Sequence, residues 1–73
     1  MFGPGEISLN DRFTMVAGTA RKVFVVESFV EAPTLPLHVR LVAEGKRNGD
    51  QLLISASALL DPRLWRRVPA KAG

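Results

Sequence analysis

The sequence predicts a mainly β fold, in which five short strands curl into a small barrel. Three observations favour it. The segment "KVFVVESFVE" is rich in the β-branched and aromatic residues that fit a pleated surface. The segment "LHVRLVAE" alternates apolar and polar residues, as a strand with one buried face does. Between it and the next apolar run lies Asn48-Gly49, a pair that favours a type I′ hairpin turn.

Both ends of the chain set the domain boundaries. "FGPGE" places two glycines around a proline, so residues 1–9 are expected to form a flexible or loosely docked lead-in. "VPAKAG" has a similar composition, and residues 69–73 are expected to be a frayed tail. Residues 10–68 are then expected to form one domain, because a chain of 73 residues is normally long enough for a single domain.

The first strand is expected in "DRFTMVAG", where Phe13, Met15 and Ala17 share one face. The second strand, "KVFVVESFVE", is apolar on both faces. One face combines Phe24, Val26 and Val30 with Ser28, and the other combines Val23, Val25 and Phe29 with Glu27 and Glu31. Because the second face is too apolar to be fully exposed, we expect a loop, a terminus or another subunit to cover part of it. Two alternatives are open: a homodimer that buries Phe29, and cover by the N-terminal segment through Phe2, Ile7 and Leu9.

"APTLP" then interrupts the pattern with two prolines, which predicts a loop. A third strand follows with Leu37, Val39, Leu41 and Ala43 directed inward. The Asn48-Gly49 turn is expected to connect it to a fourth strand, with Asp50 near Arg47. That strand, "QLLISASAL", would direct Leu52, Ile54, Ala56 and Ala58 to one face, although its serines and alanines also suit a helix.

The last element before the C-terminus is "LDPRLWRRV". Asp61 is a good helix cap and Pro62 suits the first helical position, but few residues remain for a helix. One 3₁₀ turn followed by a short final strand, "WRRV", is therefore predicted.

This order of elements resembles the small Src-homology-3-like barrels, which include KOW-type and Tudor-like domains. The features that carry the resemblance are the tight hairpin over Val39–Ile54 and the single turn at Asp61–Leu64 before the last strand. The resemblance covers residues 11–68 and implies an architecture only. The sequence has no tyrosine and lacks the acidic and aromatic motif of peptide-binding members, so no function follows from the resemblance.

Composition excludes several kinds of chemistry. The chain has no cysteine, so it forms no disulfide or thiolate metal site, and its one histidine, His38, cannot build a multi-histidine site. We find no nucleophile elbow and no phosphate-binding loop. No apolar run approaches the ~20 residues that cross a bilayer. We therefore expect a cytoplasmic protein that is not an enzyme, with no cofactor and no evident small-molecule substrate.

The charge of the chain is uneven. The net charge is +3, made up of −1 in residues 1–45 and +4 in residues 46–73, an asymmetry that can indicate an anionic partner. The candidate binding surface consists of Lys46 and Arg47 in the hairpin loop, together with Arg63, Trp65, Arg66 and Arg67 near the C-terminus. In an extended strand Trp65 and Arg67 share a face, and Arg66 lies on the other.

Three roles are open for the segment around Trp65. The ring can close a small core under the arginine stems, the residues can contact a protein, or they can stack and neutralise a single-stranded nucleic acid. We predict a non-enzymatic interaction module with a protein partner or with itself. The alternatives are a nucleic-acid-binding small barrel and a small enzyme subunit completed by a partner.

Overall fold

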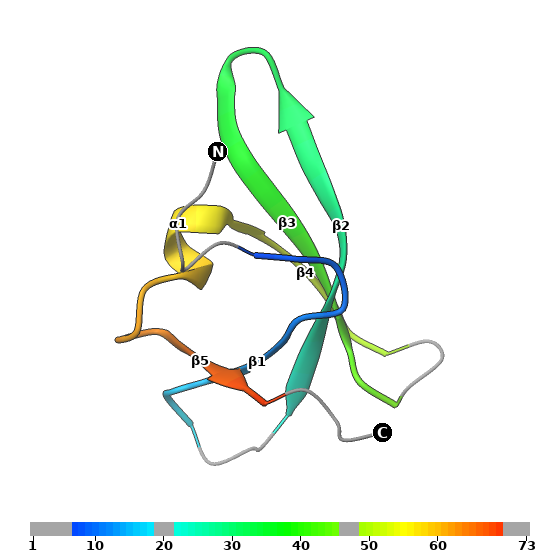
Figure 1. Cartoon of the computed structure of the whole chain (residues 1–73), viewed down its shortest axis with the longest axis vertical. Coiled ribbons are helices and arrows are strands. Elements are labelled where there is room, and N and C mark those ends of the chain that lie inside the picture. Colours follow the sequence, from blue (N-terminus) through cyan, green and yellow to red (C-terminus); the bar gives the residue numbers. More distant parts are fainter. Residues whose placement is uncertain (1–6, 19–21, 46–48, 70–73) are drawn as a thin grey trace.

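The computed structural model describes residues 7–18, 22–45 and 49–69. Its five strands form one antiparallel sheet in the order β4-β3-β2-β1-β5, so the predicted mainly β fold is confirmed (Figure 1). The strands are β1 (Arg12–Met15), β2 (Val23–Ala32), β3 (Leu35–Ala43), β4 (Gln51–Ser55) and β5 (Trp65–Val68). The described β4 and β5 do not pair with one another, so the sheet is curved but open and does not form the closed barrel that we predicted.

The core lies on the concave face of this sheet. Its most deeply buried side chains are Phe13, Val26, Val39, Leu41 and Leu59, each less than 2% exposed. Burying such side chains is the main favourable contribution to folding in a chain of this size. Val39 and Leu41, predicted to point inward from the third strand, lie in this core together with Val26. Leu52 and Ile54 of the fourth strand are only partly buried and pack against its margin.

The sequence prediction was wrong about the end of the fourth strand. β4 stops at Ser55, and the short helix α1 (Ala56–Leu59) follows it. The Ser55 hydroxyl accepts a hydrogen bond from the backbone N–H of Ala58 at 3.2 Å, which caps the helix. This turn of helix buries Leu59, because it directs the chain across the core instead of along the sheet edge.

The predicted single turn before the last strand is present. The carbonyl oxygen of Asp61 accepts hydrogen bonds from the N–H groups of Leu64 at 2.9 Å and Trp65 at 3.0 Å. The Asp61 carboxylate accepts the N–H of Arg63 at 2.9 Å, as a capping aspartate should. The turn delivers the chain to β5, which pairs with β1.

β1 is shorter than predicted. It ends at Met15, which pairs with Trp65, and the chain then bends through Val16 and Ala17. Met15 was predicted to share a face with Phe13, which is buried, but the Met15 side chain is 44% exposed. The reason is its place at the end of the strand, where no described helix or strand covers it.

Two irregularities in the β2–β3 pairing change the predicted faces of β2. Val26 lies opposite Leu41, but Ser28 lies opposite Arg40, so Glu27 is an extra residue. Beyond this bulge Phe29 lies opposite Val39 and therefore on its face, whereas Phe29 was predicted to lie on the opposite face from Val26. The same shift moves Val30 away from the core face to which we had assigned it.

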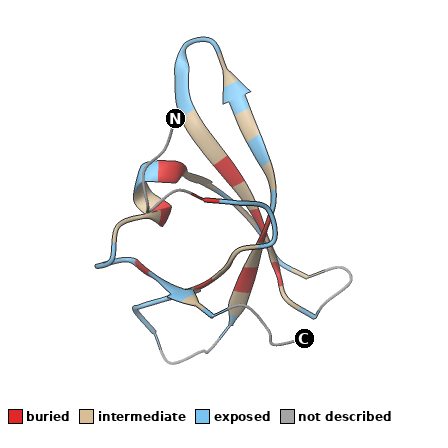
Figure 2. Cartoon of the chain, viewed as in Figure 1, coloured by how far each residue is buried: buried red, intermediate tan, exposed pale blue. Residues whose placement is uncertain are grey.

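The predicted proline loop is instead a tight hairpin. Ala32 pairs with Leu35, so only Pro33 and Thr34 connect β2 to β3, and Pro36 lies within the strand. A proline can occupy this part of β3 because β4 reaches only as far as His38 and needs no donor beyond it. We call residues 27–37 the arm. It projects as a two-stranded ribbon from the rest of the sheet, the body, and it is largely exposed (Figures 1 and 2).

The β3–β4 hairpin exists, and Val39 pairs with Ile54 in it. Val42 lies opposite Gln51, and the N–H of Ala43 donates to the carbonyl oxygen of Asp50 at 2.9 Å. The two-residue turn at Asn48-Gly49, with Asp50 near Arg47, stays a prediction. Asn48, like Lys46 and Arg47, lies outside the described residues. In the parts of the chain that the structure describes, no helix is long and apolar enough to cross a membrane.

Candidate binding surface

Trp65 lies in the core of the body. Its side chain is 6% exposed, and its ring meets that of Phe24 edge-on, with the centroids 5.9 Å apart and an interplanar angle of 83°. Of the three roles open from the sequence, core closure is the one that this geometry matches. A buried ring offers no face on which a nucleic-acid base could stack.

Arg67 covers the neighbouring part of the core. The register places it opposite Phe13, on the same face as Trp65, as predicted. Its guanidinium carbon lies 5.0 Å from the centroid of the Phe13 ring, within the range of a cation–π contact. Its Nη1 also donates to the Asp11 carboxylate at 3.0 Å. Arg67 therefore covers apolar surface. Through its hydrogen bond with Asp11 it also links β5 to the residue that precedes β1.

Arg63 is exposed but engaged. Its Nε and Nη2 donate to the two oxygens of the Asp61 carboxylate, at 3.1 and 2.9 Å. These side-chain hydrogen bonds are the main reason why the pKa of Asp61 lies below its ordinary value, and the hydrogen bond from the backbone N–H of Arg63 lowers it further. Arg66 is different: it lies opposite Thr14 on the outer side of the sheet and makes no hydrogen bond or ion pair with any described residue. Of the predicted cations that the structure describes, Arg66 is the one that a partner could bind without breaking an ion pair.

A groove follows the free edge of β5, where the strand faces α1 and the turn at Asp61. Its volume is about 460 Å³. The side chains of Phe13, Leu59 and Trp65 at its floor are at most 6% exposed, Leu60 and Pro62 are the more accessible apolar residues, and two arginines complete the lining. We call it the β5 groove. Its lining residues are Phe13, Leu59, Leu60, Pro62, Trp65, Arg66 and Arg67. The structure thus brings three predicted residues together, adds four apolar ones, and leaves Arg63 beside the groove. Lys46 and Arg47 lie outside the described residues.

Sequence reasoning missed the wall formed by Leu59 and Leu60, because Leu59 had been assigned to the end of the fourth strand and Leu60 to the start of the following turn. The available signal was Ser55, a capping residue placed three positions before Ala58, together with Asp61-Pro62 as the start of another turn. Two successive start signals for helical turns leave little room for a strand between them.

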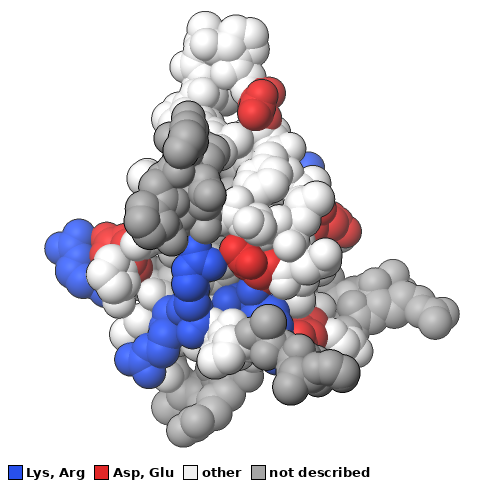
Figure 3. Space-filling view, viewed as in Figure 1, with Lys and Arg blue, Asp and Glu red and all other residues white. Residues whose placement is uncertain are grey.

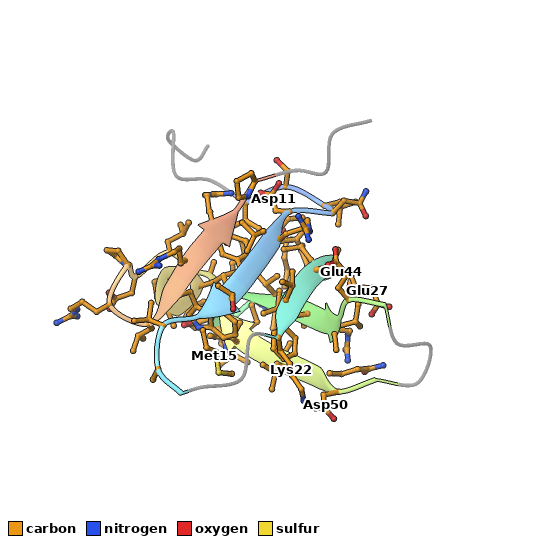
Figure 4. All side chains as sticks on the ribbon, turned by 90° about the horizontal axis from the view of Figure 1, so that it is seen from below. Asp11, Met15, Lys22, Glu27, Glu44 and Asp50 are labelled. Atoms are coloured by element: carbon orange, nitrogen blue, oxygen red, sulfur yellow. The ribbon has the colours of Figure 1, made fainter. Side chains whose placement is uncertain are left out.

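A second hollow lies at the other end of the body. Its volume is about 550 Å³, and its residues come from the end of β1 and the beginnings of β2 and β4. Met15, Phe24 and Leu52 supply its apolar lining, and an ion pair between Lys22 and Asp50 stands at its margin (Figure 4). The one cation in its described lining, Lys22, is therefore already paired. The β5 groove differs because Arg66 forms no ion pair with any residue that the structure describes.

The described residues carry six basic and six acidic side chains, so the net charge of +3 comes from the rest of the chain. Those other charged residues are Glu6, Arg21, Lys46, Arg47 and Lys71. Four of the six described cations form ion pairs: Arg12 with Glu44, Lys22 with Asp50, Arg63 with Asp61, and Arg67 with Asp11. The described surface is therefore less basic than the sequence suggested.

The strongest of these pairs in geometry is Arg12–Glu44. Nε and Nη2 of Arg12 donate to the two carboxylate oxygens of Glu44 at 2.7 and 2.8 Å, and Nη1 donates to the carbonyl oxygen of Pro69 at 2.7 Å. The hydrogen bonds with Glu44 raise the pKa of Arg12. The pair joins β1 to the end of β3 across β2, so it serves the fold and leaves no free charge for a ligand.

Neither a metal centre nor a catalytic pair is seen among the described residues. No three of their histidine, aspartate and glutamate side chains gather as metal ligands do. Nδ1 of His38 lies 2.8 Å from the carbonyl oxygen of Pro36; since a carbonyl only accepts, Nδ1 carries the hydrogen. The histidine is thus held by its own strand.

Comparison with known proteins gives no relative from which a function could be transferred. The chain matches no protein-family model. No curated protein and no solved structure shows significant similarity to it. The candidate site therefore stands on its geometry alone.

Proposed function

We propose that this chain is a non-enzymatic interaction module that binds a protein segment in the β5 groove. The observation that carries the proposal is the combination of an apolar lining, of which Leu60 and Pro62 are accessible, with Arg66, which forms no ion pair with a described residue. Arginine beside apolar surface is the composition that dominates binding energy at protein interfaces. The groove therefore suits a segment that combines apolar side chains, which would contact its apolar lining, with an acidic residue, which would pair with Arg66.

The chemistry of the lining supports a binding role over catalysis. None of its seven residues is a serine, cysteine, histidine or carboxylate, so the groove supplies neither a nucleophile nor a general base. The proposed architecture is an open form of the Src-homology-3-like barrel. The β3–β4 hairpin and the Asp61 turn before β5, the two features behind that resemblance, support it. A cytoplasmic location is also part of the proposal, and the absence of cysteine supports it.

Nucleic-acid binding is the second candidate, and the net charge of +3 favours it. It would have to rely on phosphate contacts from Arg66 and from cations outside the described residues, because Trp65 and Phe13 are buried. Such binding weakens steeply with salt, with a log–log slope of about −0.7 per phosphate on a single strand. A protein partner held on the apolar floor should depend on salt much less.

The test is an affinity purification from native cells with wild type, Arg66→Glu and the control Arg40→Glu, each with and without nuclease. Arg40 lies on β3 away from the groove and forms no ion pair with a described residue. We expect a partner that survives nuclease and binds wild type and Arg40→Glu but not Arg66→Glu. A partner lost on nuclease treatment would favour the nucleic-acid alternative, and equal binding by all three proteins would refute the groove.

A further inference from the structure

The arm continues the core stripe of β3 beyond the core. Alternate residues of this strand share one face, and Val39 and Leu41 on that face are fully buried. Leu35, on the same face, is 61% exposed, and Phe29, opposite Val39, is 36% exposed. A core-like apolar strip therefore emerges into solvent on the arm. Exposed strips of this kind are typical of contact surfaces.

The backbone edges of the arm are poorly suited to pairing with another strand. Register shifts between Val26 and Ser28 and between Val30 and Ala32 distort β2, and Pro36 removes a donor from β3. Bulges and prolines are the usual protection of an exposed sheet edge. The arm is thus fitted to dock through its side chains and not through added strand pairing.

The charges of the arm are both acidic. Glu27 and Glu31 are exposed, and Glu31 lines a hollow on the arm together with Ala32, Leu35 and Leu37. On the face drawn in Figure 3, the top of the molecule is uncharged with an acidic group beside it, while most of the basic side chains that the view shows lie over the lower half. The arm is apolar and acidic, and the β5 groove is apolar and basic.

We propose that the β5 groove is occupied by the arm of a second copy of this chain, and that two copies exchange arms reciprocally. This inference rests on the proposed function of the groove and identifies its occupant. Within one molecule the arm and β5 lie at opposite ends (Figure 1), so the arm does not reach its own groove. Under twofold symmetry each dimer has two arm–groove contacts, with Leu35 and Phe29 on the floor and Glu31 near Arg66.

The size of the molecule is compatible with such an interface. A stable contact buries about 800 Å² per partner, roughly a seventh of the 5512 Å² of accessible surface of this chain. Each copy contributes to both contacts, one through its arm and one through its groove. The burial removes exposed apolar side chains from water, which is the main source of affinity.

The experiment is sedimentation equilibrium of the full chain from low to high micromolar concentration. Wild type should dimerise. Glu31→Arg and Arg66→Glu should each raise the dissociation constant about tenfold or more, because each places like charges together at both contacts. Mixing the two variants should restore a dimer, since in the mixed pair every arm meets a groove of opposite charge. The double variant Glu31→Arg/Arg66→Glu should also dimerise on its own.

The control mixes Glu31→Arg with Arg40→Glu, which makes the same charge change as Arg66→Glu but away from the groove. Arg40→Glu should dimerise by itself as wild type does. Its mixed dimer with Glu31→Arg has like charges at one of the two contacts and should be weaker than the mixed dimer of Glu31→Arg with Arg66→Glu. A wild type that stays monomeric at high micromolar concentration overturns the inference. So does a dimer that both single variants leave intact. In either case a separate partner that Arg66→Glu loses would still support the proposed function, so the two failures are distinguishable. Circular dichroism of each variant establishes that it is folded.

Discussion

The body and the arm share two strands, β2 and β3, yet the inward face of these strands is buried only in the body. On β3 the inward side chains of Val39 and Leu41 are 0% exposed, while Leu35 on the same face is 61% exposed. The difference comes from the neighbours: β4 pairs with β3 only from His38 onward, and α1 packs against β3 beside it. The alternation of apolar and polar residues determines which face of a strand is apolar. Whether that face is buried depends on the other elements that pack against it.

The largest effect should come from truncating the same residue type in the two regions. Leu41→Ala leaves a cavity in the body and should lower the free energy of unfolding by about 2–5 kcal/mol. Leu35→Ala should change it by less than about 0.5 kcal/mol, because that side chain is already mostly in water. Urea denaturation of dilute protein measures both. Similar losses at the two positions would mean that the arm is covered in the monomer.

Substitutions in the two turns that flank β3 should also differ in how much they lower stability, but by less. Gly45, at the body end, has a φ of +80°, a conformation that a Cβ disfavours, although the space around it is open. Gly45→Ala should therefore cost about 1–2 kcal/mol through backbone strain alone. Thr34, in the turn of the arm, does not have a positive φ, so Thr34→Ala should cost little. Thermal unfolding followed by circular dichroism compares them, and equal melting temperatures would contradict the difference.

The smallest effect concerns acid. Asp61 of the body has its pKa lowered by Arg63, so its folded-state pKa lies below its unfolded-state pKa. Its contribution to stability is therefore complete above the unfolded value of about 3.9 and is lost as pH falls through the folded value. Asp61→Asn should flatten the pH dependence of stability in this acidic range. Glu27 of the arm makes no hydrogen bond or ion pair with a described residue, so Glu27→Gln is the matched control. Denaturation midpoints of dilute protein between neutral pH and pH about 3 measure the difference, and parallel curves for Asp61→Asn and wild type would contradict it.

The sequence predicted the site less completely than the fold. Trp65 and Arg67 were correctly placed on one face, since strand alternation is a local property. Core closure by Trp65 was one of the three roles open from the sequence, and its burial selects that role. The Asp11 and Asp61 carboxylates that neutralise Arg67 and Arg63 were not predicted. Arg67 and Asp11 are distant in the chain, so their ion pair depends on how β1 and β5 assemble, and the pattern of residues along one strand does not encode it. Arg63 and Asp61 are two residues apart, and their ion pair belongs to the local turn.

By itself the sequence determined the five-stranded β character, the inward stripe Leu37–Ala43 and the turn at Asp61. Each follows from local preferences: β-branched side chains, a period of two, and a capping aspartate before a proline. The tertiary structure alone decided the bulge at Glu27, the end of β4 at Ser55, the open edges of the sheet and the exposure of the arm. These depend on register and cover, which are set by contacts between distant segments. A shift of one residue moves Phe29 to the other face with no change in its own local sequence.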